Sequence, residues 1–198
     1  MSLKDKLDII LITYNRKKFL TRTLEQIFSE KSPIKNLDIT ILNNVSTDGS
    51  TELINEYCQK FPNIKHVIHN HNIGGNANIA RAFEIASKDY VWVLCDDDFY
   101  NWENWAEIER AILSDKFDLL FTATYLIRNK SDIAQLCHQA TFIPAVIYSA
   151  RCITDETMQN VHNTVNTMFS QTMISAISLL VTKIFSGCSH IIFAEIIV

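Results

Sequence analysis

The sequence predicts an α/β fold in which helices cover both faces of a mostly parallel sheet. Strand-like and helix-like segments alternate through the first half of the chain in the order β-α-β-α-β-α-β, which is the order of successive parallel crossover units. The strand-like segments include continuously apolar runs such as 9–12, which is typical of strands that are covered on both faces.

The first strand is the apolar run 9–12, and apolar residues at helical spacing follow it over 19–28. Pro33 then interrupts the pattern before a second strand over 37–42. The segment 46–50 is rich in Ser, Thr and Asp, whose side chains can accept hydrogen bonds from the free N–H groups of a first helical turn. We therefore expect a second helix to begin there.

This second helix has apolar residues from 53 to 61 and stops at a proline. A short third strand over 64–68 leads through the loop 72–75 into a third helix, with apolar residues between 79 and 86. The fourth strand is 90–95. These elements complete the alternating order that predicts the parallel sheet.

The second half of the chain is less regular: a helix over 102–112 and a strand formed by 119–121 with Tyr125 are the last elements that the pattern specifies. The segment 173–185 is apolar but shorter than the ~20 residues of a membrane span, so we expect a core helix there. The chain ends on the apolar run 196–198, from which we expect a continuation in a longer protein.

Length and composition fit one globular domain, 1–198. The chain is 47% hydrophobic and 20% charged, which is ordinary for a soluble protein. A formal net charge of −4, without a basic stripe, gives no indication of a nucleic-acid partner. The five cysteines are odd in number and scattered without a C-x-x-C pair, so we expect reduced thiols and a cytoplasmic location.

Three adjacent acids, Asp96, Asp97 and Asp98, follow the fourth strand. At ~6 Å and an effective dielectric constant of about 20, each pair of carboxylates repels by ~3 kcal/mol before screening. A divalent cation reverses that repulsion, and Mg²⁺ typically binds one or two carboxylates together with substrate phosphates. If strand geometry continues, Asp96 and Asp98 lie on one side and Asp97 on the other. An acidic turn without a ligand is the alternative.

Polar residues also follow two other strands. Tyr14-Asn15 ends the first strand and Asn43-Asn44 ends the second. In sheets of this kind ligands bind beyond the carboxyl ends of the strands, at a topological switch point. We therefore expect these two pairs and the three acids to line one edge of the sheet.

Four segments in this order and spacing resemble family 2 glycosyltransferases of the GT-A fold: IILITYNR over 9–16, ILNNVSTDGS over 41–50, NIGG over 72–75, and the acids 96–98. The resemblance covers about residues 7–100. It implies a three-layer sandwich whose first half, 7–100, binds a nucleotide sugar and whose second half, 101–198, faces the acceptor. It also implies sugar transfer from a nucleotide-diphosphate donor, for which we expect the UDP-linked form, with Mg²⁺ or Mn²⁺ at the D-x-D position.

The resemblance implies a donor site at the ends of the first two strands. Thr13 and Tyr14 match the end of the first strand, where the tyrosine packs on the nucleotide base. Asn44 matches a position that hydrogen-bonds the base edge, although the family often carries an acid there. An amide both donates and accepts, so it can still pair with a base. Packing at the rim for Tyr14, and turn or cap chemistry for Asn44, are the alternatives.

The resemblance also implies a diphosphate loop and a metal site. Asn72, Gly74 and Gly75 match the loop near the nucleotide and the diphosphate, and an ordinary turn is the alternative there. Asp96 and Asp98 match D-x-D, with Asp98 as the usual metal ligand and Asp96 facing the ribose or the metal. Breaking the sugar–phosphate bond leaves extra negative charge on the diphosphate, which a cation stabilises.

An inverting transfer needs a base for the acceptor hydroxyl. Asp155 and Glu156 are the adjacent acidic pair in the second half of the chain, although they also fit a plain helix start; Glu195 is a further candidate, and the base could lie beyond Val198. The resemblance implies a glycan or lipid-linked saccharide as the acceptor, and peripheral association with the cytoplasmic face of a membrane would fit that acceptor.

Two other functions stay open. A sugar nucleotidyltransferase usually has a glycine-rich basic loop after the first strand. This chain has the basic residues Arg16, Lys17 and Lys18 there, without glycine. The other alternative is a non-catalytic nucleotide- or partner-binding remnant, which the Asn43-Asn44 amides and the unclear base would fit. Slow metal-dependent hydrolysis of the donor would distinguish a working enzyme from such a remnant.

Overall fold

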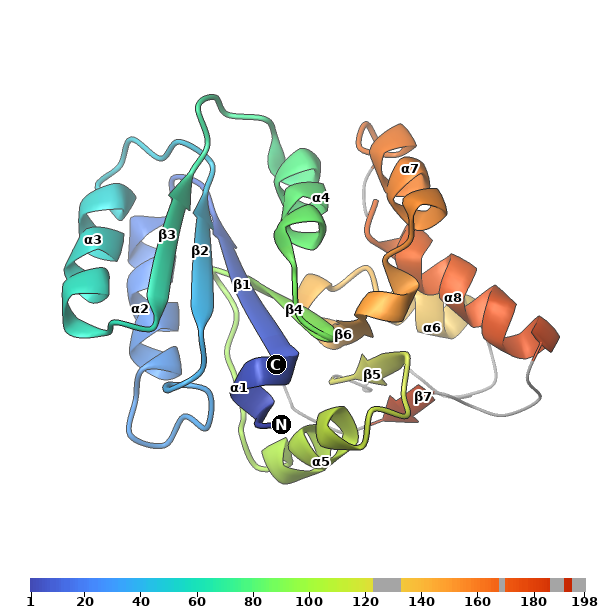
Figure 1. The fold of residues 1–198 in the computed structure, drawn as a ribbon. Coiled ribbons are helices and arrows are strands. Elements are labelled where there is room, and N and C mark those ends of the chain that lie inside the picture. The colour runs from blue at the N-terminus through green and yellow to red at the C-terminus, as the bar shows by residue number, and fades with distance from the viewer. Residues whose placement is uncertain (123–132, 168–169, 186–190, 194–198) are drawn as a thin grey trace.

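The structure is a computed structural model that describes residues 1–122, 133–167, 170–185 and 191–193. Its described strands form one sheet in the order β3-β2-β1-β4-β6-β5-β7 (Figure 1). Their bounds are β1 Leu7–Thr13, β2 Ile39–Asn43, β3 Ile64–Ile68, β4 Tyr90–Cys95, β5 Leu119–Phe121, β6 Val146–Ser149 and β7 Ile191–Phe193. Strand β6 is antiparallel to both β4 and β5, and the other described pairings are parallel. The predicted mostly parallel sheet is therefore confirmed.

Helices cover both faces of this sheet, which gives the predicted three layers (Figure 1). One hydrophobic core joins the sheet to helices α1 Leu3–Lys6, α2 Lys17–Ile27, α3 Ser50–Lys60 and α5 Trp105–Ser114. A second core lies on the other face, with helices α4 Gly75–Ile85, α6 Ile133–Gln139, α7 Asp155–Asn163 and α8 Thr172–Phe185. Two short 3₁₀ helices, Ile143–Ala145 and Ala150–Cys152, flank β6.

The continuous apolar sequence of β1 is explained by these two cores. Leu7, Ile9 and Leu11 point into the first core, whereas Ile10 points into the second. Side chains alternate along a strand, so a strand covered on both faces needs apolar residues at every position. Strand β1 is also central, because it pairs with both β2 and β4, for example through Ile9 opposite Ile39 and Trp92.

Trp92 of β4 fixes the segment that follows the acids. Its ring is fully buried and donates a hydrogen bond from Nε1 to the carbonyl oxygen of Pro144 at 2.8 Å. Tyr100, Trp102 and Trp105 pack around it with ring centroids 6.0–6.5 Å away. The chain after Asp98 therefore runs back over the first core and is held there by aromatic packing.

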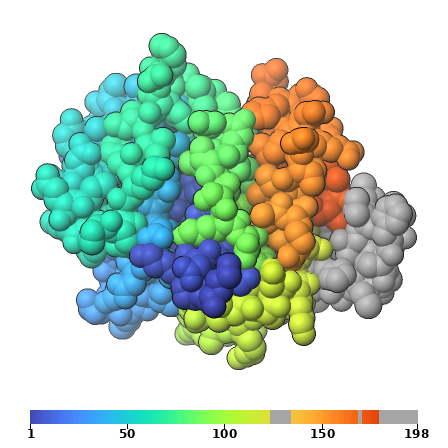
Figure 2. Space-filling model, in the orientation of Figure 1, coloured from blue at the N-terminus to red at the C-terminus, as the bar shows by residue number. Residues whose placement is uncertain are grey.

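The second half differs more from its prediction. Helix α5 begins at Trp105 and ends at Ser114, two to three residues later than the predicted 102–112. Helix α8 agrees with the core helix expected over 173–185, and no helix among the described residues is long and apolar enough to cross a membrane. Helices α4 and α7 lie side by side, in green and orange in Figure 2, and His162 of α7 is 2.7 Å from a carboxylate oxygen of Glu84 of α4.

Candidate functional site

The carboxyl ends of β1, β2 and β4 border a cavity of about 360 Å³. Predicted site residues from four separate segments line it, namely Thr13, Tyr14, Asn44, Gly75 and Asp96. Arg16, Cys95 and Asp97 also line the cavity. The structure therefore brings these residues together at one edge of the sheet, as expected from the ends of parallel strands.

Asp96 forms the floor of this site beside β1. It is 5% exposed, and Oδ2 accepts a hydrogen bond from the Thr13 hydroxyl at 2.6 Å. Burial raises the pKa of Asp96 to about 6, although the Thr13 hydrogen bond and the Arg16 charge act in the opposite direction. Asp96 and Thr13 thus join the ends of β4 and β1 through one short, buried contact.

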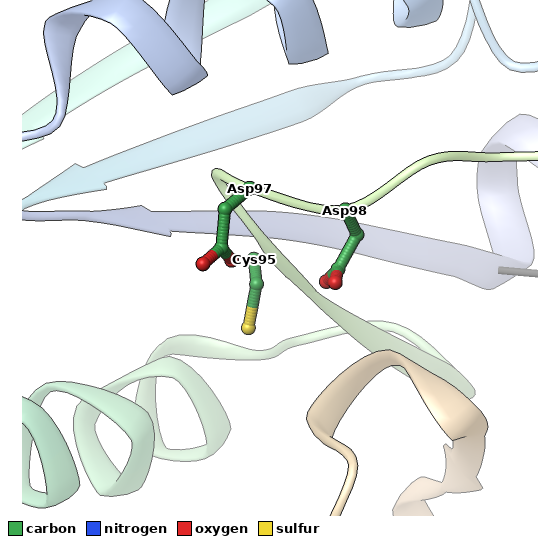
Figure 3. A group of neighbouring side chains, drawn as sticks. All are labelled: Cys95, Asp97 and Asp98. Atoms are coloured by element: carbon green, nitrogen blue, oxygen red, sulfur yellow. The ribbon is translucent and has the colours of Figure 1, made fainter.

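The acids do not continue the strand. Strand β4 ends at Cys95, and Asp96 and Asp97 form a turn, so the strand-like alternation that we considered for the three acids does not hold. Possible ligand atoms of Cys95, Asp97 and Asp98 lie within 4.8 Å of one another (Figure 3). The group of candidate ligands thus contains Asp98, Asp97 and Cys95, while the Asp96 carboxylate accepts from Thr13, so the metal role predicted for Asp96 stays a prediction.

Asp98 has an unusual environment. Its Oδ2 is buried and has no hydrogen-bond partner among the described residues. Burial raises its pKa to about 6, and the neighbouring charges of Asp97 and Asp96 add to the shift. A buried carboxylate oxygen without a partner is costly unless a cation or a proton compensates it. The carboxylates of Asp97 and Asp98 are the hard oxygen donors that Mg²⁺ and Mn²⁺ prefer, so the residues fit such an ion.

Helix α2 holds the turn in place through three polar side chains that the sequence interpretation did not identify. The Thr23 hydroxyl donates to the carbonyl oxygen of Asp96 at 2.9 Å, Arg22 donates to that of Asp97 at 2.5 Å, and Gln26 donates to that of Asp98 at 3.1 Å. Thr23 is fully buried. A polar residue on the buried side of an amphipathic helix needs a hydrogen-bond partner, and this was the signal in the sequence that could have identified it.

Arg16 is a further site residue that the sequence interpretation did not assign. Its guanidinium donates to a carboxylate oxygen of Asp97, and Nη1 is 3.8 Å from Oδ1 of Asp96. These two charges raise the pKa of Arg16 against the effect of its partial burial. A basic residue directly after Tyr14-Asn15, at the edge that carries the acids, was a signal that could have identified it.

Asn44 tethers the loop that begins α4. It is 1% exposed, donates from Nδ2 to Oδ1 of Asn72 at 2.9 Å, and accepts from the backbone N–H of Ile73 at 3.0 Å. Gly74 has φ = 86°, which favours glycine, and a Cβ on Gly75 would meet no atom within 4 Å. Asn72 and Gly74 are thus held next to the cavity, and the base contact predicted for Asn44 stays a prediction.

The backbone at this edge is strained at Val45, which has φ = 65°. A β-branched residue in the left-handed region is a clear outlier, and such strain is concentrated at functional sites. The neighbouring loops hold each other, since Asn15 accepts at Oδ1 from the N–H of Thr47 at 2.7 Å and its own N–H donates to Ser46 at 2.9 Å. Tyr14, 43% exposed, is presented from this braced loop.

The structure does not bring the predicted base to the acids. Asp155 and Glu156 are exposed in the first turn of α7, which Thr154 caps. Asp155 lines a separate open cavity together with Glu84 and His162. Carboxylates in a first helical turn are stabilised by the free N–H groups there, and this explains why two acids stand at the start of α7. Their catalytic role stays a prediction, and Glu195 lies outside the described residues.

The class of protein that this fold and this edge of the sheet indicate is a glycosyltransferase of the GT-A type, and comparison with known proteins agrees. The model of the family "Glycosyl transferase family 2" matches residues 8–195, so the chain belongs to that family. It is 33% identical over 88 residues to abequosyltransferase RfbV of Salmonella typhimurium, covering 43% of this chain and 26% of the relative. It is 26% identical over 95 residues to the poly(ribitol-phosphate) beta-glucosyltransferase of Bacillus spizizenii, covering 48% of this chain and 15% of the relative.

Solved structures support the fold. TarS of S. aureus in complex with UDP-GlcNAc has a TM-score of 0.62 at 17% identity, covering 86% of this chain and 53% of that chain. The mannosyltransferase PcManGT from Pyrobaculum calidifontis, in complex with GDP-Man and Mn²⁺, has a TM-score of 0.60 at 15% identity, covering 96% and 56%. The predicted GT-A fold is therefore confirmed. The matched part of the chain spans about half of these structures and between 15% and 41% of the curated relatives.

Proposed function

We propose that this protein transfers a sugar from a UDP-linked donor to a glycan or lipid-linked saccharide, with Mg²⁺ or Mn²⁺ held by Asp98 and the neighbouring acids. The observation that carries the proposal is the buried, unpartnered Oδ2 of Asp98 beside Asp97, in a family 2 glycosyltransferase fold. The metal supports transfer as a Lewis acid that stabilises the diphosphate leaving group. A cytoplasmic location, with peripheral association at the membrane face, belongs to the same proposal.

In this proposal the residues of the chain bind and orient the donor. Tyr14 offers an exposed ring at the cavity wall for stacking on the nucleotide base. Asn44 positions the loop 72–74, so that the start of α4 borders the cavity where the diphosphate would lie. Thr13 fixes Asp96 at the floor, which leaves the other acids for the cation.

The choice of UDP rests on the nucleotides that the similar solved structures contain. TarS structures contain UDP or UDP-GlcNAc, whereas PcManGT contains GDP-Man and Mn²⁺. The proposed acceptor class is supported by the poly(ribitol-phosphate) beta-glucosyltransferase, whose name gives a polymer as the acceptor. A titration with GDP beside UDP tests the base directly.

Thermal unfolding with UDP and Mn²⁺, alone and together, tests the proposal. A ligand at 100 times its Kd stabilises the native state by ~2.7 kcal/mol, which corresponds to a rise in Tm of about 5–10 °C for a domain of this size. We expect that rise with UDP and Mn²⁺ together and its loss on chelation with EDTA. The absence of a shift with any nucleoside diphosphate and metal would refute the proposal.

A second assay separates an enzyme from the non-catalytic alternative. A working transfer centre hydrolyses its donor slowly when water replaces the acceptor. We expect UDP release from a UDP-sugar to require Mn²⁺ or Mg²⁺ and to disappear in Asp98→Ala. Binding of UDP and Mn²⁺ without any release of UDP would favour the nucleotide-binding remnant.

A further inference from the structure

The acid cluster already contains a positive charge, the guanidinium of Arg16. This group donates to Asp97 and lies 3.8 Å from Asp96, so it is shared between two of the three acids. Arg22, the other arginine nearby, donates to the backbone carbonyl oxygen of Asp97 and stacks on Phe99 at 3.9 Å. Arg16 is therefore the basic side chain that pairs with carboxylates at the cavity.

The backbone of Arg16 is fixed while its side chain is accessible. Its carbonyl oxygen accepts from Leu20 in the first turn of α2 at 2.9 Å, and the next residue, Lys17, donates its N–H to Asp48 at 2.8 Å. The side chain is 48% exposed at the cavity wall. A long side chain on a fixed backbone can exchange its hydrogen-bond partners without any movement of the fold.

A divalent cation and the Arg16 guanidinium would compete for the Asp97 carboxylate. The possible ligand atoms of Asp97 and Asp98 lie within 4.8 Å, so a cation between them would lie beside the guanidinium and repel it. A nucleotide diphosphate in the same cavity offers a new partner, because guanidinium groups bind phosphate oxygens in a bidentate manner.

We propose that Arg16 is an internal counter-ion that competes with the divalent cation for Asp97 and moves to the donor diphosphate when the cation binds. The inference rests on the proposed function, since it requires the metal and the diphosphate. It makes Arg16 a donor-binding residue that also offsets part of the charge of Asp97 and Asp96 before the donor arrives. It also gives positive cooperativity, in which the diphosphate and the cation each raise the affinity of the protein for the other through Arg16.

The test uses opposite effects of one substitution on two binding constants. Arg16→Gln should tighten Mn²⁺ binding without nucleotide by about tenfold, because Asp97 loses its competing partner. The same variant should weaken UDP binding at saturating Mn²⁺ by about tenfold or more, because the diphosphate loses a charged hydrogen bond. Calorimetry or the Mn²⁺ electron paramagnetic resonance signal measures both constants without any catalytic step.

Lys18→Gln is the matched control, since it removes the same charge from an exposed position on α2. Both constants should stay within about twofold in this variant. Arg16→Lys keeps the charge without the bidentate geometry and should give intermediate values. Thermal unfolding without ligand confirms that each variant is folded.

The outcomes separate the inference from the proposed function. If the unsubstituted protein binds Mn²⁺ and UDP but Arg16→Gln leaves Mn²⁺ binding unchanged or weaker, the competition is refuted and the proposed function stands. If only UDP binding weakens, Arg16 contacts the donor without competing for the acids, which also refutes the inference. If the unsubstituted protein binds neither ligand, both proposals fail together.

Discussion

Replacing Asp98, a buried acid with a raised pKa, should stabilise the protein and at the same time remove the proposed metal ligand. The pKa of Asp98 is raised from 3.8 to about 6, so its charge at pH 7 destabilises the fold. A shift of about two units corresponds to ~3 kcal/mol, and solvent screening of this partly exposed group reduces the expected value to ~1–2 kcal/mol. For a domain of this size, Asp98→Asn should raise Tm by about 2–8 °C in the absence of metal.

The sign of this effect depends on pH in a defined way. The pKa of Asp98 is higher in the folded protein than in the unfolded chain, so protonation of Asp98 stabilises the fold. This stabilisation is complete below about pH 4, and it is lost as the pH rises through about 6. Thermal unfolding by circular dichroism at pH 7 and pH 4 should therefore show a gain for Asp98→Asn that largely disappears at pH 4.

Asp155→Asn provides the control for this measurement. Asp155 is an exposed acid in the first turn of α7, and its substitution should lower stability by at most ~1 kcal/mol, through the lost interaction with the helix N-terminus. A lower Tm for Asp98→Asn at pH 7, or an equal rise at both pH values, would show that burial of the Asp98 charge does not carry the cost that we infer.

Three other predictions follow from the same edge of the sheet. Binding of Mn²⁺ with UDP should weaken as pH falls through about 6, because the cation must displace a proton from Asp98; equal affinities by calorimetry at pH 7.5 and 5.5 would contradict this. Val45→Gly should be more stable than Val45→Ala by ~1 kcal/mol in urea unfolding, since only glycine relieves the positive φ, and the reverse order would remove the argument for strain. Asn44→Ala should lower stability by ~1–3 kcal/mol and weaken UDP binding, because the N–H of Ile73 loses its acceptor; unchanged melting and binding would show that the tether is dispensable.

The first half of the fold could be predicted because its signals are local. Strand β1 is continuously apolar, and both of its faces prove to be covered. Turn and capping residues over 46–50 and 72–75 marked the segments in which α3 and α4 begin, at Ser50 and Gly75. From those elements alone, the parallel-sheet rule placed Tyr14, Asn44 and Asp96 at one cavity, where the structure has them.

The other features of the fold and the site could not be predicted, because they depend on contacts between segments that are far apart in the sequence. Strand β6 is four residues long, all buried, and its antiparallel pairing with β4 and β5 leaves no periodic signal in the sequence. The turn of the acids is set by Thr23 and Gln26 of α2, about seventy residues earlier in the chain, so strand alternation does not extend from β4 through Asp98. Arg16 was visible as a basic residue, but its pairing with Asp97 is a tertiary contact.

Anomalous diffraction from crystals soaked in Mn²⁺ and UDP tests the central claim most directly, since it locates the ion and the nucleotide in one map. We expect a manganese peak within bonding distance of Asp98, with the UDP diphosphate on the same ion and Arg16 withdrawn from Asp97. UDP bound in the cavity without a manganese peak at Asp98 would contradict the account of why these acids lie together.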